Sequence, residues 1–257
     1  MIIIGKNFCC TDLHGMWRLW EEIKFYCGPD DTIYFLGDAA DRGVDGLRII
    51  KDLLLDKRVI YLKGNHEDMF TIVAPEAIEG RSGDLMWWYM NGGQETYEAF
   101  MKLDYNEQMW FINKLNALPD HLTIKNAKGQ TIFLSHAGTA LDYEEWKKKL
   151  IKGGNPYIWD RKHIHRPWSE LEEHKDWFMV HGHTPTPILL EELNNMRRFQ
   201  GKPIIPFKSI EIVEYCDGHK FDLDLMSFAT NKVALFDLDE MKVEKYFDFP
   251  IEDLTYV

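Results

Sequence analysis

Short apolar runs that each end in a polar cluster constrain the fold of this chain more than any other feature. We expect a first strand within Ile2–Thr11 and further strands at Ile33–Leu36 and Val59–Leu62, separated by amphipathic helices at Met16–Tyr26 and Leu47–Leu55. This alternation is typical of βαβ units around a mostly parallel sheet, so the predicted fold class is α/β. Because the carboxyl ends of such strands meet in one crevice, the polar clusters are expected to converge in space.

The second half of the sequence predicts a more antiparallel arrangement. The runs 121–125 and 131–134 flank a short connection that ends in Gly129, and 177–180 forms a further strand. Two more pairs are expected, at 210–215 with 220–225 and at 232–236 with 243–247. The polar stretch 191–202 is predicted to be a surface loop or a short helix, and the role of the region 190–220 is left open.

Composition limits the class of protein and its partners. A length of 257 residues suits one large domain or two small ones, and we take 1–257 as a single domain. The 30 basic and 42 acidic side chains give a net charge of −12, which repels nucleic-acid phosphates, so no nucleic-acid partner is expected. The N-terminus has no basic, apolar leader and no run approaches the roughly 18 apolar residues of a membrane span, so we expect a cytoplasmic protein with no membrane partner.

Five clusters of oxygen and imidazole donors follow predicted strands. They are Asp12-Leu13-His14-Gly15, Gly37-Asp38-Ala39-Ala40-Asp41-Arg42-Gly43, Gly64-Asn65-His66-Glu67, Ser135-His136-Ala137-Gly138 and Gly182-His183-Thr184-Pro185. Carboxylate, amide and imidazole donors together suit manganese, iron or zinc, and Asp38 is the natural bridge between two ions about 3.5 to 4 Å apart. Two ions would lower the pKa of a shared water toward about 7 and supply a bridging hydroxide at neutral pH.

Each cluster also has a simpler interpretation. Taken alone, Asp12-Leu13-His14 is more often a turn or a cap, and Gly64-Asn65-His66 is more often a tight turn. Lone histidines such as His136 and His183 are usually hydrogen-bonded core residues, and the neighbouring His181 competes with His183 for the same role. The joint occurrence of five clusters in an order that one metal centre can use favours the metal site.

The ordered motifs resemble the phosphoprotein phosphatase branch of the calcineurin-like metallophosphoesterases, and are most similar to small bacterial and phage serine/threonine phosphatases. The resemblance covers about residues 3–187. It implies a four-layer α/β/β/α sandwich with two divalent ions at the strand ends. By this resemblance one ion takes Asp12, His14 and Asp38, and the other takes Asp38, Asn65, His136 and His183.

The same resemblance assigns His66 as the general acid, and the chemistry of its predicted neighbour agrees. Asp41 would accept a hydrogen bond from the ring and stabilise the imidazolium, which keeps a proton available for the leaving group. Arg42, Arg161 and Asn65 are expected to bind the substrate phosphate, because a guanidinium fork matches two phosphate oxygens. For Arg161 a surface arginine on a solvated turn remains the alternative.

Other features carry less weight. The segment Trp87–Gly93 either shapes the site entrance or is a packed helix that stops at Asn91-Gly92, and the packed helix is favoured. The pair His163 and His165 is predicted to lie on an exposed loop. Cys9 and Cys10, adjacent in the first strand, are predicted to be reduced thiols packed on opposite faces.

Two places depart from the motifs of the resembled family. Pro185 stands where many phosphodiesterase relatives have a second histidine, so water would complete the shell of the first ion. The stretch Leu223-Asp224-Leu225-Met226 replaces an Ile-Asp-Thr-Gly sequence, so the C-terminal lip of the site is expected to differ.

The sequence therefore predicts a metal-dependent phosphomonoesterase, and specifically a serine/threonine protein phosphatase that works best in vitro with manganese. Its partners would be phosphorylated proteins or small phosphoesters. A symmetrical dinucleoside tetraphosphate hydrolase is the alternative enzyme, since its motifs are very similar. A non-catalytic scaffold of the same fold is an alternative of another class.

Overall fold

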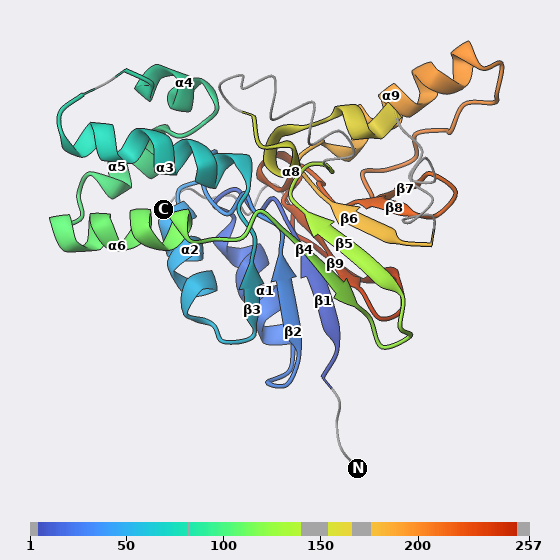
Figure 1. Cartoon of the computed structure of the whole chain (residues 1–257), viewed down its shortest axis with the longest axis horizontal. Coiled ribbons are helices and arrows are strands. Elements are labelled where there is room, and N and C mark those ends of the chain that lie inside the picture. The colour runs from blue at the N-terminus through green and yellow to red at the C-terminus, as the bar shows by residue number, and fades with distance from the viewer. Residues whose placement is uncertain (1–4, 82, 140–153, 166–175, 251–257) are drawn as a thin grey trace.

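Two five-stranded sheets form the centre of the computed structural model, which describes residues 5–81, 83–139, 154–165 and 176–250 (Figure 1). The first sheet has the order β10-β9-β1-β2-β3, and the second has the order β4-β5-β6-β8-β7. The strands of the first are β1 (Asn7–Cys10), β2 (Thr32–Phe35), β3 (Val59–Tyr61), β9 (Lys232–Asp237) and β10 (Lys242–Asp248). Those of the second are β4 (His121–Lys125), β5 (Thr131–Ser135), β6 (Phe178–His181), β7 (Val213–Tyr215) and β8 (Lys220–Asp222).

The first half folds as the βαβ pattern predicts. Strands β1, β2 and β3 are parallel neighbours, and α1 (Trp17–Tyr26) and α2 (Gly46–Leu55) connect them. Four further helices extend this layer: α3 (Asn65–Ile78), α4 (Leu85–Met90), α5 (Gln94–Phe100) and α6 (Tyr105–Asn116). Their apolar faces share one large core with the first sheet, which includes Cys10, Trp20 and Phe70.

A second core lies between the sheets, and its residues show how the layers stack. Cys9, Tyr34 and Leu36 of the first sheet pack against Leu134 and Val180 of the second. Cys9 therefore faces the other sheet while Cys10 faces the helices, which confirms the predicted opposite orientation. Neither thiol forms a disulfide.

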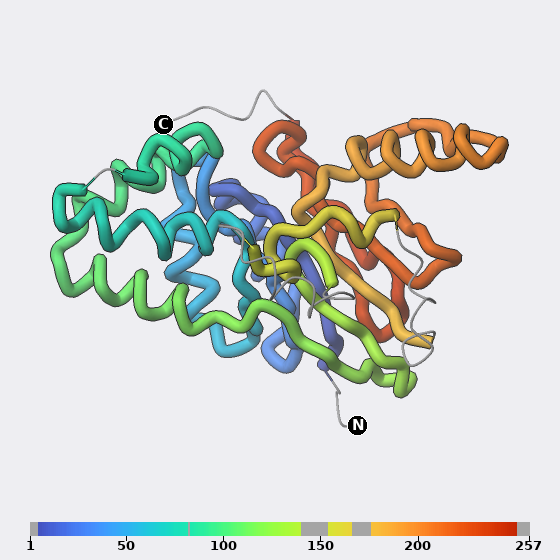
Figure 2. The backbone as a smooth tube through the Cα atoms, turned by 45° about the horizontal axis from the view of Figure 1, so that its top comes forward, coloured from blue at the N-terminus to red at the C-terminus, as the bar shows by residue number. Residues whose placement is uncertain are grey.

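The outer face of the second sheet is covered by α8 (Pro156–Trp159), the 3₁₀ helix η1 (Lys162–His165) and α9 (Thr186–Phe199). Figures 1 and 2 show these elements on one side of the paired sheets and α1 to α6 on the other. The predicted four-layer α/β/β/α sandwich is confirmed. A short helix, α10 (Ser227–Thr230), precedes β9.

The second sheet differs from the prediction in one respect. Its outer pairs β4/β5 and β8/β7 are antiparallel as expected, but β5, β6 and β8 run parallel to one another. The carboxyl ends of β5 and β6 therefore lie at the same edge, and this brings His136 and His183 together.

Helix α9 is longer than the loop or short helix expected near residues 191–202. It begins at Thr186, directly after Pro185, and Pro187 lies in its first turn. Proline suits the first turn of a helix because the amide hydrogens there have no partner within the helix. In the described part of the chain, no helix combines the length and apolar character needed to cross a membrane.

Candidate metal centre

The predicted site residues converge at the carboxyl ends of the strands. Asp12 and His14 follow β1, Asp38 follows β2, Asn65 and His66 begin α3, His136 follows β5, and His183 follows β6. Backbone hydrogen bonds tie these loops together: His14 N donates to Asp38 O at 3.0 Å, and Gly182 N donates to His136 O at 2.8 Å. The five clusters thus form one buried group, as the fold class predicts.

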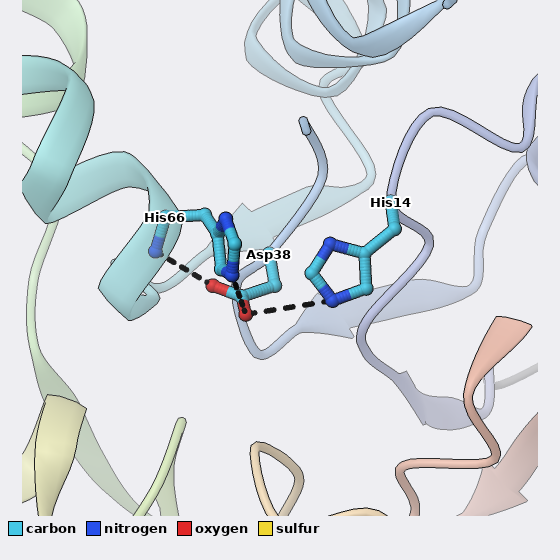
Figure 3. Close-up of side chains that lie close together, drawn as sticks. All are labelled: His14, Asp38 and His66. Carbon is cyan, nitrogen blue, oxygen red and sulfur yellow. Dashed lines mark hydrogen bonds and ion pairs between the residues drawn. The ribbon is translucent and has the colours of Figure 1, made fainter. Parts of the chain in front are cut away.

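Asp38 lies at the centre of this group (Figure 3). Its Oδ1 accepts a hydrogen bond from the backbone N–H of His66 at 3.0 Å. Its Oδ2 lies 3.4 Å from His136 Nε2 and 3.7 Å from the Nε2 atoms of both His14 and His66. Burial opposes ionisation, but the surrounding rings of His136 and His66 hold the pKa of Asp38 well below its usual value. One carboxylate is therefore shared by three imidazoles.

The histidine rings direct nitrogen lone pairs into the centre. Carbonyl oxygens can only accept, so Nδ1–H of His14 donates to Ala40 O at 3.0 Å and Nδ1–H of His136 donates to Leu36 O at 2.8 Å. In the neutral form that can bind a metal ion, Nε2 of each ring is then the lone-pair donor and faces inward. Such second hydrogen bonds are what orient metal-binding histidines in proteins.

Asn65 supplies an oxygen to the same centre. Its Oδ1 lies 2.9 Å from His136 Nε2 and 2.7 Å from His183 Nδ1. Burial alone would lower the pKa of His136, but the neighbouring Asp38 carboxylate raises it to about 9. A cation between the oxygen and the ring nitrogens satisfies both kinds of atom.

Asp12 completes the oxygen set. Its Oδ2 accepts from Thr11 Oγ1 at 2.6 Å and from His183 N at 3.2 Å, and burial, followed by repulsion from Asp224, raises its pKa well above the usual value. Across the described ranges neither Asp12 nor Asp38 pairs with a lysine or arginine. Buried carboxylates without a cation are costly, so the donor set fits bound metal.

Two groups of residues could each hold a metal ion, because the ligand atoms within each group lie within 4.8 Å of one another. One group is His14, Asp38 and His66, and the other is Asp12, Asp38 and His136. Asp38 belongs to both groups, as a bridging ligand must. The first group contains His66, for which the family resemblance implies acid catalysis.

His66 also belongs to a second buried contact. Its Nδ1 lies 2.6 Å from Asp41 Oδ2, and both side chains are 1% exposed. Trp88 Nε1–H donates to the same carboxylate oxygen at 2.8 Å, and Thr96 Oγ1 accepts from Asp41 N at 3.0 Å. The sequence pointed to the segment that contains Trp88 but not to its contact with Asp41, and it did not identify Thr96, because both contacts depend on the tertiary packing of α4 and α5.

The two predicted arginines reach different sides of the centre. The Arg42 guanidinium donates to Nε2 of His14 and, at 3.1 Å, to Nε2 of His66, and it lies 4.8 Å from the ring centroid of Phe228. Arg161 donates from Nε to Thr184 Oγ1 at 3.2 Å and from a terminal nitrogen to His183 O at 3.1 Å. Both positive charges therefore border the metal-ligand loops.

Backbone conformation marks the same residues. Eleven non-glycine residues of the described chain have positive φ, and six of them belong to the predicted site: Asp12, His14, Asp38, Asp41, Arg42 and His183. Left-handed conformations cost free energy for residues with a Cβ, and they cluster at functional sites. This concentration was not readable from the sequence.

The structure bears on three further sequence predictions. Residues 87–90 of the segment Trp87–Gly93 belong to the packed helix α4, which ends before Asn91 and Gly92, as favoured, and Trp88 is fully buried. The prediction of an exposed loop is wrong for His163, which is 1% exposed within η1, although His165 is exposed. His181 faces Tyr215 rather than the metal ligands, and burial lowers its pKa to about 3, so the ring is neutral.

The chain is similar to known enzymes of phosphate hydrolysis. An asymmetrical bis(5'-nucleosyl)-tetraphosphatase from Oceanobacillus iheyensis is 26% identical over 197 residues, which are 68% of this chain and 75% of the relative. A metallophosphoesterase structure from Sphaerobacter thermophilus matches with a TM-score of 0.56 at 15% identity, over 96% of this chain and 90% of that one. A serine/threonine phosphatase from Saccharomyces cerevisiae, similar to human phosphatase PP5, matches with a TM-score of 0.52 at 15% identity, over 87% and 68%.

The structural likenesses concern the fold, whereas a sequence profile identifies the family. The profile of the calcineurin-like phosphoesterases matches residues 8–223, which extends past residue 187, where the resemblance was expected to weaken. This span contains all five clusters and both sheets' central strands. The chain belongs to the calcineurin-like phosphoesterase family and is a hydrolase of phosphoester bonds.

Proposed function

We propose that this protein removes phosphate from phosphomonoesters and belongs to the phosphoprotein phosphatase branch, with phosphoserine and phosphothreonine of proteins as its substrate class. The observation that carries the proposal is the position of Asp38. Its carboxylate belongs to two groups of metal-ligating atoms and lies 3.7 Å from a histidine that is paired with a buried aspartate.

The family uses a two-metal centre, and the donors fit it. Asp12, His14 and Asp38 would hold one ion, and Asp38, Asn65, His136 and His183 the other. When bound, such ions lower the pKa of water and neutralise charge on phosphoryl oxygens. The mixed oxygen and imidazole set suits manganese, iron or zinc, and manganese is our choice for assays.

His66 is the proposed general acid. Asp41 accepts a hydrogen bond from His66 Nδ1–H and stabilises the protonated ring, and Trp88 fixes the orientation of that carboxylate. Nε2 is thereby directed at the centre, where a leaving oxygen would need a proton. A held acid contributes most when the leaving group is a basic alkoxide, such as the side chain of serine, which favours a phosphomonoester substrate.

Arg42, Arg161 and Asn65 are the proposed phosphate ligands. Both guanidinium groups border the metal-ligand loops, and their donors suit two oxygens of one phosphate. They would also offset the −12 net charge of the chain at the point where an anion must bind.

A dinucleoside tetraphosphate is the second candidate substrate. The specific observation in its favour is the Oceanobacillus iheyensis relative, whose name specifies asymmetrical cleavage, whereas the sequence motifs had suggested the symmetrical enzyme. A nucleotide leaving group is far less basic than an alkoxide, so this substrate would depend less on His66. A non-catalytic scaffold is not proposed, because the six ligand side chains are all present and converge.

The test compares kcat/KM of manganese-loaded protein on a phosphoserine peptide and on diadenosine tetraphosphate, each with a chelator control. We expect a chelator-sensitive preference for the peptide. A preference for the dinucleotide would indicate nucleotide hydrolysis as the function. The identity of the nucleotide products would then distinguish symmetrical from asymmetrical cleavage. Absence of turnover on both substrates would contradict the proposal.

A further inference from the structure

Three buried polar side chains, joined by hydrogen bonds, lie beneath the segment that carries Arg161. Tyr215 in β7 places its hydroxyl 2.7 Å from His181 Nε2 and 3.2 Å from His163 Nε2. All three side chains are at most 6% exposed, and the two imidazole rings meet edge to face with centroids 4.8 Å apart. The catalytic proposal uses none of these three residues.

The hydrogen bonds among these three side chains have a defined direction. Gly182 O can only accept, so His181 donates to it from Nδ1 at 3.0 Å, and the Nε2 of the neutral ring must accept. Tyr215 therefore donates its hydroxyl proton to His181 and accepts from His163 Nε2–H. These hydrogen bonds link η1 through β7 and β6 to Gly182, the residue before His183.

Two further contacts hold the backbone on both sides of Arg161. Lys220, which is fully buried, donates from Nζ to His163 O at 2.7 Å. Asp160 Oδ2 accepts from His163 N at 3.2 Å. A buried ammonium group is expensive unless it is hydrogen-bonded, so its placement against this carbonyl favours one backbone position for η1.

Arg161 itself makes a second connection between the same two segments. Its guanidinium donates to Thr184 Oγ1 and His183 O, which are part of the loop that begins at Gly182. The segment 161–163 and the loop 182–184 are thus joined twice, once through Arg161 on the site side and once through Tyr215 on the core side.

We propose that Tyr215 is a positioning residue that fixes the Arg161 guanidinium relative to His183, so that the site binds a tetrahedral phosphate. This inference rests on the proposed function, because it takes Arg161 to be a phosphate ligand. It differs from a purely structural role in one respect: the effect of the Tyr215 hydroxyl on phosphate binding must pass through Arg161.

A double-mutant cycle tests this dependence. Tyr215→Phe removes both hydrogen bonds and keeps the ring, Arg161→Ala removes the guanidinium, and the cycle is completed by the double variant. The readouts are the affinity of the manganese-loaded protein for inorganic phosphate by titration calorimetry, the KM and kcat for phosphoserine peptide, and metal content. Tyr246→Phe, which removes a hydroxyl that accepts from Ile212 N in a contact that does not involve Arg161, His163 or His181, is the matched control.

We expect Tyr215→Phe to weaken phosphate binding and raise KM by about twofold to tenfold, the range of a net hydrogen-bond contribution, with metal content unchanged. In the Arg161→Ala background the same substitution should change phosphate affinity little. Thr184→Val, which removes the acceptor of Arg161 Nε, should show the same dependence and serves if Tyr215→Phe is too unstable to purify.

Equal losses from Tyr215→Phe in both backgrounds would overturn the inference, as would a lower melting temperature with unchanged phosphate affinity. An Arg161→Ala variant that binds phosphate normally would also overturn it, yet would leave the metal-dependent activity of the wild-type protein intact. Failure of the proposed function gives a different result, namely no turnover by the wild-type protein.

Discussion

His66 contacts Asp41 with one ring nitrogen and lies close to the proposed metal ligands with the other. Its Nδ1 lies 2.6 Å from Asp41, whereas its Nε2 lies 3.7 Å from Asp38 and accepts from Arg42. The first contact suits a general acid, and the second places the other nitrogen among the metal-ligating atoms. The two roles predict different consequences when the ring is replaced.

We predict that His66→Asn lowers kcat on a phosphoserine peptide by roughly 10² to 10⁴, because general acid catalysis contributes about that much. The loss on p-nitrophenyl phosphate should be much smaller, since nitrophenolate leaves without a proton. Steady-state kinetics on both substrates and elemental analysis of bound manganese check this. Loss of metal from the variant would instead make His66 a ligand.

Asp38 is predicted to be the residue on which both ions depend. Asp38→Asn keeps the size of the side chain but removes the charge that His14, His66 and His136 surround, so both ions should bind weakly and activity should nearly vanish. Asp52→Asn, in a contact with Trp20 and Lys24 away from the centre, should retain metal. Two ions bound to the Asp38 variant would place the bridge elsewhere.

At the scale of elements, the first turn of α3 organises two motifs through Glu67. This buried carboxylate accepts from the backbone N–H groups of Asp38, Ala39 and Gly64 at 2.8 to 2.9 Å, and from the Tyr61 hydroxyl at 2.8 Å. The helix that begins with Asn65 and His66 therefore also fixes the loop that carries Asp38.

Glu67→Gln is expected to destabilise the protein by about 1 to 3 kcal/mol, because the amide NH₂ would face backbone N–H groups that need an acceptor. Manganese affinity should fall as well, since Asp38 loses its support. Denaturant unfolding and metal titration measure the two effects. Glu95→Gln, an exposed glutamate in the first turn of α5, is the control and should stay within about 0.5 kcal/mol of wild type. An equally mild effect at Glu67 would contradict this role.

The sequence predicted the elements and the site unequally, for physical reasons. The parallel strands β1 to β3 and the convergence of Asp12, Asp38 and His183 followed from apolar periodicity and from the rule for strand ends. The start of α3 was missed because Gly64-Asn65-His66 resembles a turn, although Glu67 three residues after Gly64 signals a helix N-terminus. The loop or short helix predicted at 191–202 is the second half of α9, and its start at Thr186 was not recognised although proline in a first turn is typical of a helix N-terminus.

Contacts between distant segments left no local signal. Trp88 reaches Asp41 across 47 residues of sequence, and Tyr215 reaches His163 across 52. Apolar patterning identifies such aromatic residues as core, but the partner of an indole N–H or a phenol hydroxyl depends on tertiary packing. The buried His163 was placed on an exposed loop for the same reason.

For the whole molecule, the proposed metal ligands come from both sheets. Asp12 and Asp38 follow strands of the first sheet, and His136 and His183 follow strands of the second. Ions that bind all four must stabilise the folded state, because the unfolded chain cannot bring these residues together. This link between the sheets should be visible in thermal unfolding.

Manganese is expected to raise the melting temperature of the metal-free protein. At a free concentration of 100 times Kd the stabilisation is about 2.7 kcal/mol per site, which corresponds to roughly 5 to 10 °C for a chain of this size. Scanning calorimetry with and without chelator measures it, and Asp38→Asn should show little shift. If manganese left the melting temperature of the wild-type protein unchanged, this would contradict a metal centre shared by both sheets.

The left-handed backbone of Asp12, His14, Asp38, Asp41, Arg42 and His183 also affects how this protein can be engineered. At about 1 kcal/mol each, six such residues cost roughly 6 kcal/mol, comparable to the roughly 5 to 15 kcal/mol that separates a folded domain from its unfolded chain. Directed evolution for heat resistance alone would therefore favour glycine at these positions and eliminate the side chains that are proposed to bind metal and substrate. A stabilised variant of this enzyme has to be selected for turnover in the same round.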